Sequence, residues 1–248
     1  MKKSKKYRDH LESLSNLSIS KKQQIITHLL NSCPVAKWPR TMPASIDPKL
    51  VLIGVSPGGS QNKDVNEDEF ISEPSVHKSE KSNFFYPDKN NYWKKIRLIT
   101  YRYFNSHEDI KLKDALSLTS HFNLGTKLTG KASKKAVDDE IIKWVSYLLN
   151  KVHKPDQLIL FGLKNILQDP DKSKQWNHKE GLKINWSSAQ RITPLNSYKS
   201  VNYKFREWTV TNELKHTFNV TLWPNHPSRP PFSKNFEMWS KAVNEFLS

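Results

Sequence analysis

The chain has 248 residues, of which 40 are Lys or Arg and 24 are Asp or Glu, so its formal net charge is +16. This length allows one large domain or two small ones. The positive charge favours a protein that binds a polyanion over a basic protein without such a partner. The single cysteine, Cys33, excludes an internal disulfide and a zinc site built from cysteines. No apolar run reaches the roughly 20 residues of a membrane-spanning helix, so we expect an intracellular chain without a membrane partner.

The N-terminal part predicts a basic extension that precedes the main domain. Residues 1–7 form a lysine-rich tail, and a helix is expected over 18–30, where Ser20 and Gln23 have capping-box spacing. Prolines punctuate residues 33–48, which indicates an extended connector. We therefore divide the chain into a basic tail and helical extension over 1–45 and one domain over 46–248.

Apolar runs in the domain predict strands, and amphipathic stretches between them predict helices. Strands are expected at 50–55, within 115–126, at 157–162 and at 219–224. Helices are expected at 90–104, 136–151 and 233–247, where apolar residues recur at helical spacing. Two segments, at about 59–82 and 164–212, predict insertions; the second contains several possible short strands but no definite element.

Strands that alternate with helices predict an α/β fold with a parallel sheet covered on both faces. Such sheets bind ligands beyond the carboxyl ends of their strands. Three polar, turn-rich segments follow predicted strands: SPGGS at 56–60, HFNLGT at 121–126 and PNHPSRPP at 224–231. We expect these three segments to converge on one site.

Taken together, five segments resemble motifs of the uracil-DNA glycosylase superfamily, from about residue 50 to the C-terminus. GVSPGG at 54–59 resembles the first motif of the mismatch-specific and single-strand-selective branches, and LWPNHPSRPPFS at 222–233 resembles the second. FFYPDKNNYWKKI, HFNLGTKLTGKASK and KPDQLILFG resemble an aromatic-rich segment, the pyrimidine-reading loop and a central strand. The resemblance implies a three-layer α/β/α sandwich around a four-stranded parallel sheet.

The resemblance implies that His226 stabilises the departing base and that the residue at position 56 holds the attacking water. By itself His226 fits a surface histidine in a proline-rich turn, but the combined motifs favour a catalytic role. Both nearest branches have Asn where this chain has Ser56, and serine is a weak base at neutral pH. Three alternatives follow: Ser56 positions water for a dissociative cleavage, a carboxylate such as Asp64, Glu67 or Asp68 takes over, or glycosylase activity has been lost.

For recognition of the base, the resemblance implies one amide and one aromatic ring. Asn123 would pair with a pyrimidine edge, because an amide offers both a donor and an acceptor; the alternative is an ordinary turn asparagine. Phe84 would stack on the base, with Phe85 as the second candidate. Val55 and Gly58 would lie beside the base, and the glycine leaves space where the most uracil-restricted branch has a bulky Tyr.

DNA contacts are implied for the segment that follows His226. The family inserts a Leu wedge four residues after this histidine, where this chain has Pro230, so Arg229 or Phe232 is expected to act as the wedge. Ser228 in the same motif and Lys127 after the pyrimidine-reading loop are expected to contact DNA. Further candidates for phosphate contacts, each of which also fits a solvated surface, are Lys94, Lys95, Arg97, Lys131 and Lys234.

The function that these residues imply is that of a monofunctional DNA glycosylase. It would flip out uracil or a 5-substituted or modified pyrimidine, such as a hypermodified phage cytosine, and hydrolyse the N-glycosidic bond. We expect double- or single-stranded DNA as partner, no metal or organic cofactor, a monomer, and a location in the bacterial cytoplasm with the nucleoid or in a eukaryotic nucleus. Two alternatives stay open: a non-catalytic protein of the same fold that binds modified or foreign DNA, and a nucleotide or nucleoside hydrolase, which the positive charge disfavours.

Overall fold

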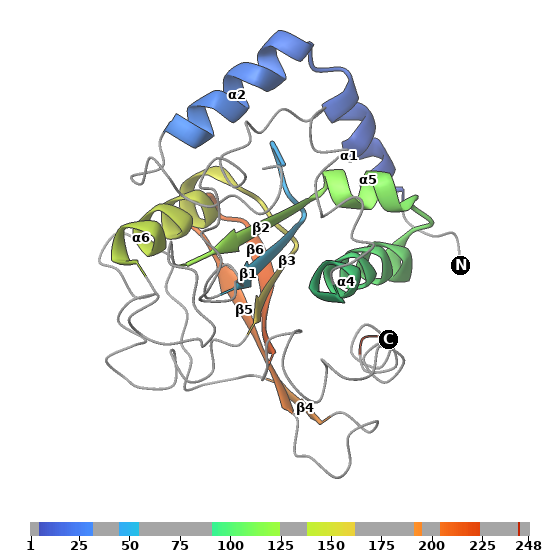
Figure 1. Ribbon diagram of the computed structural model, residues 1–248, viewed down its shortest axis with the longest axis vertical. Coiled ribbons are helices and arrows are strands. Elements are labelled where there is room, and N and C mark those ends of the chain that lie inside the picture. Colours follow the sequence, from blue (N-terminus) through green and yellow to red (C-terminus); the bar gives the residue numbers. More distant parts are fainter. Residues whose placement is uncertain are drawn as a thin grey trace.

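Helices cover both faces of one central sheet (Figure 1). The computed structural model describes residues 5–31, 45–54, 91–124, 138–161, 191–194, 204–223 and 243. Over these residues the α/β class expected from the alternation of apolar strands and amphipathic helices is confirmed.

The parallel part of the sheet consists of the strands that the apolar runs predict. These strands are β1 (Leu50–Gly54), β2 (Thr119–Asn123), β3 (Gln157–Phe161) and β6 (Thr217–Trp223). β1 pairs in parallel with β2 on one side and β3 on the other, and β3 pairs in parallel with β6. β1, β2 and β3 are buried along their whole length, as strands between two helical layers must be.

The sheet is wider than the predicted four strands, because a hairpin extends it beyond β6. Over the described residues it has six strands in the order β2-β1-β3-β6-β5-β4. β5 (Lys204–Thr211) and β4 (Arg191–Pro194) are antiparallel and come from the segment 164–212, which predicted no definite element. β5 does carry a strand signal, since buried Trp208 and Val210 alternate with exposed Thr209 and Thr211.

One face of the sheet packs against α2 (Ile19–Asn31) and α6 (Asp139–Tyr147), which a short π-helix, η3 (Leu148–Val152), continues. Leu29 and Ile141 from these helices share a core cluster with Val51, Phe122 and other strand residues. The serine that caps α2 is Ser18, whose Oγ accepts from the backbone N–H of Lys21 at 3.2 Å. Ser20 lies inside the helix, so the predicted capping box is wrong.

The other face packs against α1 (Lys6–Ser15), α4 (Asn91–His107) and α5 (Leu112–Ser117). Ile96 and Ile99 of α4 share a second core cluster with Leu52 and Ile159 of the sheet. Val243 joins this cluster; the rest of the helix predicted at 233–247 lies outside the described residues. α5 replaces the beginning of the strand predicted within 115–126, and the strand itself starts at Thr119.

The predicted basic tail is in part an ordered helix that packs on the domain. Tyr7 in α1 is buried, and its ring meets that of Phe104 edge-on at 4.9 Å between centroids. The apolar area that its ring buries against α4 stabilises this segment on the domain, although the neighbouring lysines favour solvent. No helix among the described residues is both long and apolar enough to cross a membrane.

Candidate functional site

The carboxyl ends of the parallel strands lie side by side at one edge of the sheet. β1 ends at Gly54 beside Asn123, the last residue of β2, and β3 ends at Phe161 beside Trp223, the last residue of β6. The rings of Phe161 and Trp223 meet edge-on at 5.4 Å between centroids. Neighbouring strands are about 4.8 Å apart, so the ends of β1 and β6, with β3 between them, are about 10 Å apart.

Apart from the candidate phosphate contacts on α4, Asn123 is the one proposed site residue that lies within the described part of the chain, and it is buried at this edge. Its side chain is on the face that α4 covers, because Leu50 and Leu52 of β1 point to that face and Gly54 continues their alternation. A Cβ at position 54 would lie 2.7 Å from Asn123 Oδ1 and 3.9 Å from His121 Nε2. Glycine at position 54 therefore makes room for the amide.

The backbone around Asn123 is held on two sides. The N–H of Leu124 donates to the carbonyl of Gly54 at 3.1 Å, and the N–H of Asp138 donates to the carbonyl of Leu124 at 2.8 Å. Asp138 in turn caps α6, because its Oδ1 accepts from the N–H of Glu140 at 2.9 Å. The strand end that carries Asn123 is thus fixed by β1 and by the start of α6, which preorganises the amide.

The other proposed site residues lie outside the described residues. They are Val55, Ser56, Gly58, Asp64, Phe84, Phe85, Lys127, His226, Ser228, Arg229, Pro230 and Phe232. In the sequence Ser56 follows the last residue of β1 by two positions, and His226 follows the last residue of β6 by three. The segments that carry them therefore leave the sheet at the edge where Asn123 lies.

A buried lysine, Lys95, lies in the first half of α4. The sequence indicates a phosphate contact on the surface for Lys95, but its side chain is only 2% exposed. Burial lowers the pKa of its ammonium group to about 8. The sequence does contain a signal for this burial. Lys95 precedes Ile96 and lies four residues before Ile99, so it belongs to the helical stripe that packs on the sheet.

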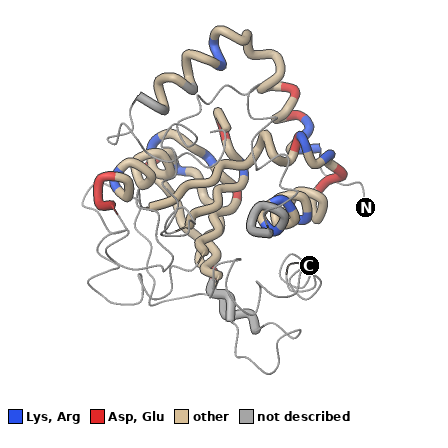
Figure 2. Tube along the Cα trace, in the orientation of Figure 1, with Lys and Arg blue, Asp and Glu red and all other residues tan. Residues whose placement is uncertain are grey.

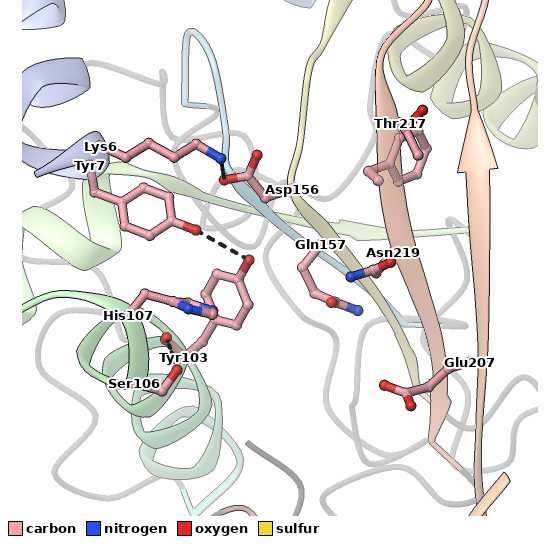
Figure 3. Close-up of a pocket in the computed structure, with 11 residues that line it drawn as sticks. Lys6, Tyr7, Tyr103, Ser106, His107, Asp156, Gln157, Glu207, Thr217 and Asn219 are labelled. Carbon is pink, nitrogen blue, oxygen red and sulfur yellow. Dashed lines mark hydrogen bonds and ion pairs between the residues drawn. The ribbon is translucent and has the colours of Figure 1, made fainter. Parts of the chain in front are cut away.

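At the opposite, amino edge of the sheet, the structure has a cleft of about 460 Å³ between α1, α4, β3 and β6. Lys6 Nζ pairs with Asp156 Oδ2 at 2.8 Å, and the hydroxyls of Tyr7 and Tyr103 are 3.4 Å apart (Figure 3). Burial raises the pKa of both tyrosines and lowers the pKa of His107, which favours the neutral forms. Because the polar groups from α1 pair with α4 and the start of β3, we interpret this cleft as the joint that fastens α1 to the domain.

Replacing Tyr7 by alanine is expected to loosen α1 without disturbing the carboxyl edge. The substitution removes both the aromatic contact with Phe104 and the hydroxyl pair with Tyr103. Backbone amides of residues 6–15 should exchange with solvent on the order of 10-fold faster. Tyr101→Ala, at a more exposed tyrosine of α4, is the matched control. Unchanged exchange in α1 would show that the cleft does not fasten it.

Comparison of the chain with protein-family models, with curated proteins and with solved structures finds no match. Among the described residues, no three His, Cys, Asp or Glu side chains gather in a way that could hold a metal ion.

Proposed function

We propose that the chain is a DNA glycosylase that extrudes a pyrimidine nucleotide and hydrolyses the bond between its base and its sugar. The observation that carries this proposal is the buried amide of Asn123, preorganised over Gly54 where the parallel strands end. An amide in this place offers one donor and one acceptor to the edge of a pyrimidine. An enzyme that reads a base in this way must take it out of the DNA stack.

The order of the strands supports a single pocket made from three segments. β2 and β6 lie on opposite sides of the β1–β3 pair, so the segments after β1, β2 and β6 start within about 15 Å of one another. We propose that Asn123 holds the base, with Phe84 or Phe85 stacked on it, and that His226 donates a hydrogen bond to the departing base. Ser56, or a carboxylate such as Asp64, would position the water that attacks the sugar.

The charges of the two helices that begin at this edge suggest how DNA approaches. α6 opens with Asp139 and Glu140, whereas the first turn of α4 has no acidic residue and its first half carries Arg97 in addition to the buried Lys95 (Figure 2). Phosphates would be repelled by the start of α6, so we propose that the DNA backbone passes on the α4 side. On that side, Arg229 or Phe232 would fill the gap left by the extruded nucleotide. Both are near Ser228 and Pro230 in the sequence. Lys127 would contact a phosphate.

The base that this pocket would accept is a uracil or a pyrimidine with a substituent at position 5. Gly58, which follows Val55 and Ser56 in the segment after β1, brings no side chain that would block such a substituent. Hypermodified cytosines of phage DNA belong to this class. The reaction needs no metal ion or organic cofactor in this proposal, because water is the nucleophile and the protein supplies the hydrogen-bond donors.

The proposal predicts abasic sites in DNA that carries the right base. Oligonucleotides with uracil, a G:T mismatch, 5-hydroxymethylcytosine or glucosylated 5-hydroxymethylcytosine are incubated with the chain and then cleaved with alkali. We expect cleavage of at least one of these oligonucleotides. His226→Ala should lower the rate of base release about 100-fold or more. His28→Ala, at an exposed histidine of α2, should leave the rate unchanged.

A chain that cleaves none of these DNAs, while it binds one of them firmly, would contradict the enzymatic proposal. That outcome would favour a non-catalytic protein that recognises modified or foreign DNA. Ser56 in the proposed water-binding position supports this alternative, because serine is a weak base. Under either function, binding should weaken steeply as salt rises, because phosphate contacts release counterions. Salt-independent binding would exclude DNA as the partner.

A further inference from the structure

Buried polar side chains gather between α4 and the carboxyl edge of the sheet. Lys95, His121 and Asn123 are each at most 4% exposed. Asn123 lies on the face of the sheet that α4 covers, and His121, two residues before it on β2, points to the same face. Lys95 belongs to the stripe of α4 that packs on this face, next to Ile96 and one turn before Ile99.

Lys95 lies at the height of the strand ends. The last residue of α4, His107, lines the cleft at the amino edge together with Gln157, the first residue of β3. Lys95 lies twelve residues before His107, and a helix of that length rises about 18 Å. The neighbouring five-residue strands span about 13 Å from their amino to their carboxyl ends. For a helix that runs back along the strands, this rise places Lys95 level with, or slightly beyond, the ends of β1 and β2, where Asn123 lies.

An ammonium group in this position costs stability. Taking a charge out of water is unfavourable, and an apolar side chain in the same stripe would pack against the sheet without that cost. With a pKa of about 8, roughly nine in ten Lys95 side chains still carry the charge at pH 7. A charge kept in a buried layer beside a candidate pocket is a mark of a functional group.

We propose that the Lys95 ammonium contacts the extruded base from the α4 side and stabilises the negative charge that the base acquires as it leaves. This inference rests on the proposed glycosylase function and adds a catalytic residue to it. A preformed positive charge in a water-poor site is most effective where charge develops in the transition state.

The reaction balances without a change in the protonation of Lys95. The bond from C1′ of the sugar to the ring nitrogen breaks, and its electron pair goes to the base. Water adds to C1′ and loses a proton, and the base anion gains a proton, so the products are the free base and an abasic sugar. Lys95 keeps its proton and donates a hydrogen bond to an oxygen or nitrogen of the base throughout.

The test compares two leaving groups. Single-turnover release of uracil and of 5-fluorouracil is measured for the wild type, for Lys95→Met and for Lys143→Met, an exposed lysine of α6 as control. Fluorine withdraws electrons and makes the base a better leaving group, so it needs less help from a positive charge. We expect Lys95→Met to slow uracil release about 100-fold and 5-fluorouracil release about 10-fold. For a wild type that acts on cytosines, 5-hydroxymethylcytosine and 5-formylcytosine form the equivalent pair.

Equal slowing of both bases, or none, would overturn the role of Lys95, because the loss of a charge that stabilises the departing base must slow the poorer leaving group more. Lys95→Arg, which keeps the charge, should recover part of the rate; an Arg variant as slow as Lys95→Met also overturns it. Lys95→Gln replaces the Met variant if that variant does not fold. A wild type that releases no base from any DNA contradicts the proposed function itself, so the two failures are distinguishable.

Discussion

Under the proposed glycosylase function, replacing Gly54 by alanine is expected to slow base release about 100-fold; the same change should destabilise the chain by roughly 1–3 kcal/mol. Gly54 lies in a strand, where alanine fits the backbone, so the effect comes from space rather than from backbone conformation. The new methyl group would lie 2.7 Å from Asn123 Oδ1, well inside contact distance, so the amide must move. An amide displaced by about half an ångström would lose its alignment with the pyrimidine edge that we propose it binds.

A double-mutant cycle separates this cause from a general weakening of the sheet. Asn123→Ala removes the atom that Gly54→Ala would strike, so the free energy of unfolding should change less than additively when the two are combined. The expected coupling is about 1 kcal/mol, measured by urea unfolding, and it does not depend on any enzymatic activity. Ile53→Val, whose side chain packs on the opposite face, serves as the control. Strictly additive free energies would show that residues 54 and 123 do not meet.

The position of Asn123 could be predicted, because the apolar strand and the polar segment after it both indicate the carboxyl edge of the sheet. β1, β2 and β3 are apolar enough to be recognised from sequence, and a polar residue that ends such a strand must lie at the carboxyl edge. The closeness of Asn123 to Gly54 could not be predicted, since it depends on the parallel register of β1 with β2. Pairing between distant segments leaves no local pattern.

Other features were missed because tertiary packing outweighs local preference. Lys95 falls in a helical stripe, but a lysine is normally assigned to the surface, and only the packing of α4 on the sheet shows that it is buried. Tyr7 is surrounded by lysines, so its segment resembles a mobile tail until the contact with Phe104 is known. For β5, the alternation was present, but the short turn to β6, with Lys215 at a φ of 59°, lacks the glycine that marks most hairpins.

Acidification from pH 6.5 to pH 4 is expected to remove about 3 kcal/mol of stability through one histidine, His153. His153 follows η3 and is 2% exposed, and its Nδ1 has no hydrogen-bond partner among the described residues. Burial, with the charge of Lys49 as a smaller cause, lowers its pKa from 6.5 to about 4, although Asp47 acts in the opposite direction. The unfolded chain therefore binds a proton between pH 6.5 and 4 that the folded chain does not.

The sign of this effect follows from which state takes up the proton. Because protons bind the unfolded state more strongly in this window, the free energy of unfolding falls as the pH falls, by up to about 1.4 kcal/mol per pH unit.

Urea unfolding between pH 4 and 7 measures the slope for the wild type and for His153→Leu, which keeps the volume of the side chain and removes its titration. The Leu variant should have a shallower slope, and His28→Gln, at an exposed position of α2, should keep the wild-type slope. Burial also lowers the pKa of His10 and His107, so a residual slope in the same direction is expected. A Leu variant that loses stability as steeply as the wild type would contradict the burial of a neutral imidazole at the end of η3.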